Sequence, residues 1–97
     1  MRMMIRWSVP ADKGNQSISS GAMQKSIESM LKDLKPEAAY FMATGGKRGG
    51  MMIFDMADSS QIPQLAEPLF QAFNAEVEFV PVMNAEDLQK AFSRLAS

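Results

Sequence analysis

The sequence has 97 residues, which is the length of one compact domain, so we expect residues 1–97 to fold as a single unit. Ten Lys and Arg against eleven Asp and Glu give a formal charge of −1, which argues against a basic nucleic-acid binder and a polybasic membrane anchor. The absence of both Cys and His excludes disulfides, thiolate or imidazole catalysis and zinc clusters. A content of 46% hydrophobic and 22% charged residues is typical of an ordinary globular protein.

No apolar run approaches the ~20 residues needed to span a bilayer, and residues 1–6 lack the features of a secretory signal. The acidic residues are scattered without the alternating spacing of a calcium loop. We therefore expect a cytoplasmic protein that has neither a metal site nor a cofactor and that binds neither membranes nor nucleic acid.

The first half of the chain begins with an alternating pattern over residues 2–9, which predicts a strand. Residues 10–15 are polar turn formers and predict a loop. An apolar stripe then predicts one helix from residue 17 or 20 to residue 34, and Pro36 ends it.

A glycine-rich segment lies at the centre of the chain, between two apolar segments. Residues 37–44 and 51–56 read as strands, and residues 45–50 (Gly-Gly-Lys-Arg-Gly-Gly) read as the hairpin loop that joins them. A helix is expected over residues 61–73, with a break at Pro68 because proline lacks the helical N–H donor.

The last segments are a strand over residues 77–83 and a C-terminal helix capped by Asn84. Pro81 lacks an N–H donor, so it places that strand at a sheet edge or marks the end of the strand. Strand, helix, strand, strand, helix, strand and helix in this order, with right-handed crossovers, predict an α+β, ferredoxin-like βαββαβ(α) fold. We expect a four-stranded antiparallel sheet in the order 4-1-3-2 with its helices on one face.

Alternation divides the strand residues between two faces of this sheet. One set is apolar throughout and fits beneath the helices: Met3, Ile5, Trp7, Met52, Phe54, Met56, Val77 and Phe79. The other set mixes large apolar residues with charges: Met4, Arg6, Ser8, Tyr40, Met42, Thr44, Met51, Ile53, Asp55, Glu76, Glu78, Val80 and Val82. A bare solvent face would carry fewer apolar residues and a monomer core no charges, so this mixture favours an interface between two subunits with a cavity in it.

Short motifs add a resemblance to known families. Phe54-Asp55-Met56, then residues 67–70 (Glu-Pro-Leu-Phe), then residues 76–82 (Glu-Val-Glu-Phe-Val-Pro-Val) resemble the C-terminal half of muconolactone isomerase-like proteins. Residues 5–7 (Ile-Arg-Trp) and the chain length also resemble a family of uncharacterised bacterial proteins known only as a domain of unknown function. The resemblance implies a homodimeric α/β barrel in which two ferredoxin-like sheets pack face to face around a pocket.

Three charged residues on the mixed face are the main candidates for chemistry. Arg6 is a candidate anchor for a carboxylate ligand, and Asp55 and Glu78 are candidate catalytic proton acceptors. The alternative is a buried ion-pair network that fixes the register of the dimer. Ser8 and Tyr40 on the same face are further candidate ligand-binding residues.

Two other features have a functional and a structural interpretation. The loop at residues 45–50 offers backbone amides and two cations to an anion, or it is a solvated hairpin tip. The ten Met residues line an adaptable apolar pocket, or they fill an irregular core.

Three functions stay open at this point. The first is a small protein whose homodimeric barrel holds a small, partly apolar organic molecule, acidic or neutral. The second is a cofactor-independent isomerase or monooxygenase that acts through Asp55 or Glu78. The third is a structural dimerisation module without a ligand.

Overall fold

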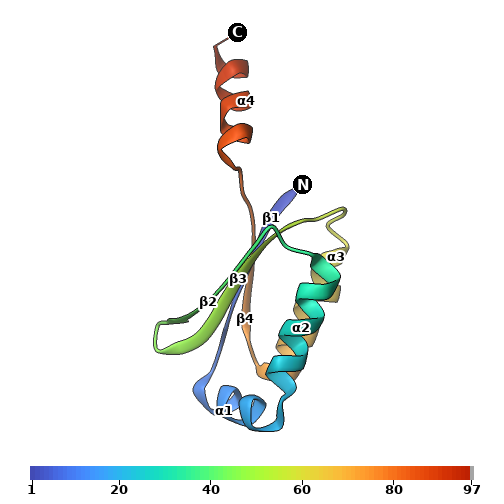
Figure 1. The fold of residues 1–97 in the computed structure, drawn as a ribbon, viewed down its shortest axis with the longest axis vertical. Helices are drawn as coiled ribbons and strands as arrows, with labels where there is room; N and C mark the ends of the chain where they lie inside the picture. The colour runs from blue at the N-terminus through green and yellow to red at the C-terminus, as the bar shows by residue number, and fades with distance from the viewer. Residues whose placement is uncertain (97) are drawn as a thin grey trace.

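The computed structural model describes residues 1–96 as one antiparallel sheet with helices on one side of it and a last helix beyond its end (Figure 1). The elements, in chain order, are β1 (Arg2–Val9), α1 (Ala11–Ser20), α2 (Ala22–Leu34), β2 (Ala38–Thr44), β3 (Lys47–Asp55), α3 (Gln61–Phe73), β4 (Glu76–Pro81) and α4 (Ala85–Leu95).

The sheet has the order β2-β3-β1-β4, and every neighbouring pair is antiparallel. This is the order 4-1-3-2 read from the other edge, so the predicted α+β, ferredoxin-like arrangement is confirmed. Pro81 ends the edge strand β4, where the missing N–H donor costs no hydrogen bond to a further strand.

The predicted loop at residues 10–15 is wrong, because a helix begins directly after Pro10. Helix α1 ends at Gly21, whose φ of 80° also starts α2, so the single predicted helix is two. Gly14 misled the prediction. It stands inside α1, where an added Cβ would lie 2.7 Å from the guanidinium of Arg48 on β3. The lack of a side chain at Gly14 thus allows α1 to pack close to Arg48 of the sheet, and the glycine does not mark a turn.

The predicted six-residue hairpin loop is also too long. The turn consists of Gly45 and Gly46, both with positive φ (58° and 76°), which is the pattern of a two-residue type I′ hairpin. Gly49 and Gly50 lie within β3, at positions where neighbouring atoms leave no room for a side chain. A Cβ at Gly50 would lie 2.5 Å from the indole ring of Trp7.

The predicted break at Pro68 does not occur, and α3 runs through it. Pro68 and Gln64, whose carbonyl loses its helical partner, are both exposed, so water can take the place of the missing donor. The strand predicted at residues 77–83 ends earlier, at Pro81. The predicted cap of the last helix is confirmed, with Asn84 and Asp87 forming a reciprocal capping box.

The core lies between α1–α3 and the sheet face that was predicted to be apolar. Ile5 and Met52 are fully buried at its centre, and Met23, Met30, Leu69 and Phe73 cover them from the helices. Five of the ten Met residues are in this core, which favours the packing interpretation for those five: Met3, Met23, Met30, Met52 and Met56.

Two parts of the molecule lie outside this core. The second face of the sheet has no helix on it, and α4 projects away from the end of β4, so that the molecule measures 55 × 26 × 18 Å (Figure 1). Within residues 1–96, none of the helices is both long and apolar enough to cross a membrane.

Candidate functional site

The strand register arranges the uncovered sheet face, called here the open face, in rows that run across the strands. One row joins Tyr40, Met51, Arg6 and Glu78. The next row toward the hairpin turn joins Met42, Gly49, Ser8 and Glu76, and the next row in the other direction joins Ala38, Ile53, Met4 and Val80. The mixed face predicted from alternation is therefore a real, continuous surface.

The middle and the β2 side of the open face are apolar. Tyr40 is 63% exposed, and Met42 and Val80 are each 37% exposed. Met4, Met51 and Ile53 between them are half-buried only by their neighbours in the sheet. Contiguous apolar groups of this size on a sheet face are unusual where the face meets only water.

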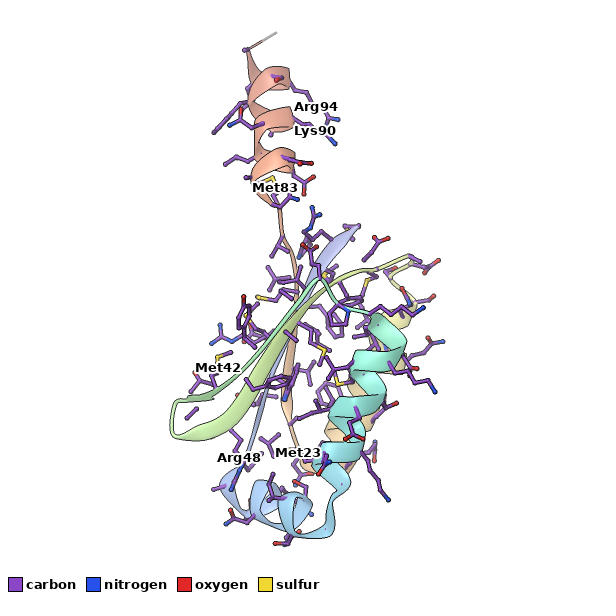
Figure 2. All side chains as sticks on the ribbon, in the orientation of Figure 1. Met23, Met42, Arg48, Met83, Lys90 and Arg94 are labelled. Carbon is purple, nitrogen blue, oxygen red and sulfur yellow. The ribbon has the colours of Figure 1, made fainter. Side chains whose placement is uncertain are left out.

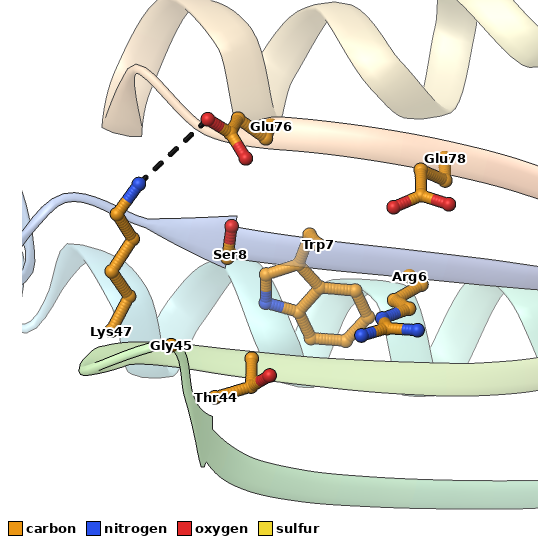
Figure 3. Close-up of a pocket in the computed structure, with 8 residues that line it drawn as sticks. All are labelled: Arg6, Trp7, Ser8, Thr44, Gly45, Lys47, Glu76 and Glu78. Carbon is orange, nitrogen blue, oxygen red and sulfur yellow. Dashed lines mark ion pairs between the residues drawn. The ribbon is translucent and has the colours of Figure 1, made fainter.

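A pocket of about 220 Å³ lies at the hairpin end of the open face, between β4, β1 and the β2–β3 turn (Figure 3). We call it the Arg6 pocket. Its lining residues are Arg6, Trp7, Ser8, Thr44, Gly45, Lys47, Glu76 and Glu78. Strand pairing positions most of them, since Ser8 lies opposite Glu76 and Arg6 opposite Glu78.

The charges in the Arg6 pocket are unequally paired. Lys47 Nζ lies 3.7 Å from Glu76 Oε1, a contact that bridges the rim of the pocket (Figure 3). In the part of the chain described here, Arg6 makes no ion pair within 4.0 Å, although Glu78 is its cross-strand neighbour. The Arg6 guanidinium thus keeps its hydrogen-bond donors available to an anionic group.

The structure brings together three of the five predicted site residues. Arg6, Ser8 and Glu78 line the Arg6 pocket. Tyr40 lies in the same row as Arg6, but two strands away on β2 and outside the lining. Lys47, Thr44 and Glu76 also line the pocket. Thr44 and Glu76 were assigned to the mixed face without a role, and Lys47 was considered only as a cation of the hairpin loop. Only the correct length of β3 places Lys47 beside Glu76.

Asp55 lies elsewhere on the open face. It pairs with Arg2, four residues from Arg6 along β1, which is about 13 Å in an extended strand. Its Oδ1 lies 2.7 Å from the α-ammonium of Met1. Hydrogen bonding and charge from that ammonium lower the pKa of Asp55. This carboxylate is held in its charged form at a distance from the pocket.

A second polar cluster joins the sheet to α4 at the end opposite the hairpin. Arg2 bonds Glu37 through Nε at 2.5 Å and also bonds Asp87 in the first turn of α4. The hydrogen bond to Glu37 is the main cause that raises the pKa of Arg2. The pKa of Asp87 is lowered, first by the backbone N–H of Asn84 and then by Arg2. This cluster is an anchor for α4.

Of the two interpretations of the segment at residues 45–50, the anion site with two converging cations does not fit the geometry. Lys47 and Arg48 are successive residues of a strand, so their side chains leave opposite faces of the sheet. Lys47 faces the Arg6 pocket, whereas Arg48 lies against α1. Among residues 1–96, no three carboxylates converge into a set that could hold a metal ion.

Comparison with known proteins places the chain in a family. No curated protein matches the sequence. A family described as a domain of unknown function, DUF3303, matches residues 1–96. Since that match covers nearly the whole length, the chain belongs to the DUF3303 family of domains of unknown function.

Proposed function

We propose that two copies of this chain pack through their open faces and hold a small, partly apolar organic acid in the Arg6 pocket. The observation that carries the proposal is that Arg6 forms no ion pair with any of residues 1–96, in a pocket at the margin of an uncovered apolar sheet face. The proposal includes the predicted homodimeric barrel and the resemblance to muconolactone isomerase-like proteins. A cytoplasmic location stays a prediction from composition.

The open face supports the dimer. Its apolar rows would meet the same rows of a second copy across a two-fold axis, as in isologous interfaces. Burial of Tyr40, Met42 and Val80 in that contact would supply favourable free energy at about 25 cal/mol per Å² of apolar area removed from water.

The size of the pocket supports a shared site. About 220 Å³ in one chain is less than the roughly 300–1,000 Å³ of typical small-molecule sites. A second sheet would supply the missing wall, exclude water and strengthen polar contacts with the ligand.

The polar lining supports an acidic ligand. Arg6 offers a planar fork that matches a carboxylate, and the hydroxyls of Ser8 and Thr44 are further hydrogen-bond donors. Lys47 offsets the charge of Glu76, so a bound anion meets one uncompensated carboxylate, Glu78, rather than two.

An isomerase or monooxygenase is the second candidate, and the position of Glu78 favours it. Glu78 is the one predicted proton acceptor that lines the pocket beside Arg6, whereas Asp55 does not. Turnover of lactone or polyphenolic substrates that Glu78→Gln abolishes, with ligand binding retained, would establish this function. A dimer that binds no ligand would instead support the third function, a structural dimerisation module.

Titration with benzoate tests the pocket, with benzyl alcohol as the uncharged comparison. Isothermal titration calorimetry measures the affinity, because the ring of the single tryptophan, Trp7, packs in the core on the helix-covered side of the sheet. We expect benzoate to bind and Arg6→Gln to weaken it about 10-fold or more, because a charged hydrogen bond is lost. Lys32→Gln on the exposed side of α2 is the matched control. Equal benzoate affinity in Arg6→Gln and the unmodified protein would refute the site.

A further inference from the structure

Helix α4 is amphipathic, and its apolar side packs against no other element of residues 1–96. No residue of α4 is buried. Its apolar side presents Leu88 at 39%, Phe92 at 52% and Leu95 at 82% exposure, and Met83 just before it is 64% exposed. We call residues 82–96 the arm. An 11-residue helix is marginal in water by itself, so such a stripe favours a contact with another surface.

The arm is nevertheless built as an ordered helix. The capping box of Asn84 and Asp87 begins it, and the bond from Arg2 to Asp87 fixes its first turn to β1. The apolar residues Leu88, Phe92 and Leu95 follow at the i, i+4, i+7 spacing of helices that insert into grooves.

The helix layer of the same chain has a gap over β2. Phe41 and Ala43 lie on the helix-facing side of β2, but both are exposed, Phe41 at 52%. An apolar groove of about 230 Å³ lies there, beside α2. We call it the β2 groove. Trp7, Val9, Met23, Ile27 and Phe41 form its apolar wall, and Arg48 is at its rim. The Phe41 ring stands edge-on to Trp7, with 6.2 Å between ring centroids.

The arm and the β2 groove lie at opposite ends of the molecule. Figure 2 shows Lys90 and Arg94 on α4 far from Met23, Met42 and Arg48. In the structure of one chain the arm therefore leaves the groove open. At one end of the molecule, α4 is a helix that covers no part of the sheet. At the other end, the helix-facing side of β2 has no helix over it.

From this match we propose that the arm of one copy docks in the β2 groove of a second copy, with Leu88, Phe92 and Leu95 against the wall around Phe41. The sheet contact proposed above would cover the open face. A groove between α2 and α3 is lined by Ser26, Ser29, Asp33 and Gln64 besides its apolar residues, whereas the wall of the β2 groove is apolar and suits the apolar side of the arm. The inference extends the proposed homodimer. Two-fold symmetry makes the arm contact twice, so the two arms add equal areas to the interface between the sheets.

The absence of native Cys allows a direct test in the full chain. The variant Ala43→Cys with Ala91→Cys places one thiol beside the groove and one on the apolar side of α4, and both native residues are small. We expect mild oxidation to give a disulfide-linked dimer on a non-reducing gel. The control, Ala43→Cys with Lys90→Cys, puts the second thiol on the opposite side of α4 and should stay uncrosslinked.

A second variant measures the affinity of the contact. Phe92→Asp lies on an exposed position of the single chain, so it leaves the monomer fold intact. We expect the dimer dissociation constant, measured by sedimentation, to rise roughly 30-fold or more, the effect of removing a hot-spot aromatic.

The possible outcomes separate this inference from the proposed function. Crosslinked dimers together with a weaker Phe92→Asp dimer support the arm contact. An unmodified dimer that Phe92→Asp leaves unchanged, with no crosslink, would overturn the arm contact alone. A crosslink within one chain would also overturn it. An unmodified chain that sediments as a monomer would overturn both proposals.

Discussion

Leu69 on α3 and Leu95 on α4 both lie on the apolar side of an amphipathic helix, yet Leu69 is 3% exposed and Leu95 is 82% exposed. The body of the molecule satisfies the apolar side of each of its helices with one face of the sheet. The arm and the open face carry apolar patterns of the same kind and find no cover in the chain. An apolar pattern in the sequence therefore predicts that a surface is covered, but it does not say whether the same chain or a second copy covers it.

The largest effect is expected for Leu69→Ala, matched with Leu95→Ala. Loss of a buried leucine from the core should lower the free energy of unfolding by about 2–5 kcal/mol. Leu95→Ala should change it by less than about 0.5 kcal/mol in the isolated chain. Chemical denaturation at several protein concentrations measures both. If the loss of unfolding free energy in Leu95→Ala grows with protein concentration, a second copy covers the arm. If Leu95→Ala loses as much as Leu69→Ala at every concentration, the arm is packed within its own chain, which contradicts the contrast drawn above.

The next effect separates two glycines that both misled the sequence prediction. Gly50→Ala would put a Cβ 2.5 Å from the rigid Trp7 ring and should destabilise the fold by about 1–3 kcal/mol. Gly14→Ala meets the flexible end of Arg48 and gains helix propensity of up to about 1 kcal/mol, so it should be close to neutral. Thermal unfolding of the two variants gives the ranking, and a reversed order would contradict the packing described for Trp7.

A smaller effect is expected at the start of the arm. Asn84→Ala removes the side-chain oxygen that accepts from the N–H of Asp87, and loss of such a cap costs about 1 kcal/mol. The loss should stay within the arm, because α4 shares no buried residue with the core. Amide hydrogen exchange should therefore accelerate in α4 and stay unchanged in β1 and β3. Acceleration throughout the sheet would mean that the arm folds as part of the body.

The smallest effect is the pH response of the arm. The pKa of Asp87 is below its ordinary 3.8, first because of the N–H of Asn84 and then because of Arg2. A depressed pKa in the folded state gives stability that is complete above the ordinary value and is lost as the pH falls through the folded pKa. Protection of the α4 amides should accordingly decline below about pH 4, and Asp87→Asn should flatten that decline. An identical decline in the variant would exclude this carboxylate as its cause.

Much of the fold was predictable because strand alternation is a strong local signal. It assigned the covered face, with Ile5 and Met52 at its centre. Pro81 in turn indicated the edge position of β4. The errors came from two glycines read as turn formers and from Pro68, which was expected to break α3. Gly14 and Gly50 were read as turn formers, whereas they permit close packing between elements distant in sequence, which local patterns do not record.

Alternation predicted which side chains share the open face, whereas the strand register decides which of them lie close together. Arg6, Ser8 and Glu78 follow from alternation on adjacent strands, and they line one pocket. The two-residue turn at Gly45–Gly46 places Lys47 in β3, beside the pocket. Asp55 shares the face of the three pocket residues, but the register between β1 and β3 pairs it with Arg2, beside the α-ammonium of Met1.

The central claim is that the open face is an interface between two copies, and native mass spectrometry of freshly purified protein tests it most directly. One spectrum reports the number of subunits and any small molecule that they retain. We expect a dimer at micromolar concentration, with additional mass where a ligand has stayed in the Arg6 pocket. A monomer at that concentration would show that the open face is not an interface between two copies.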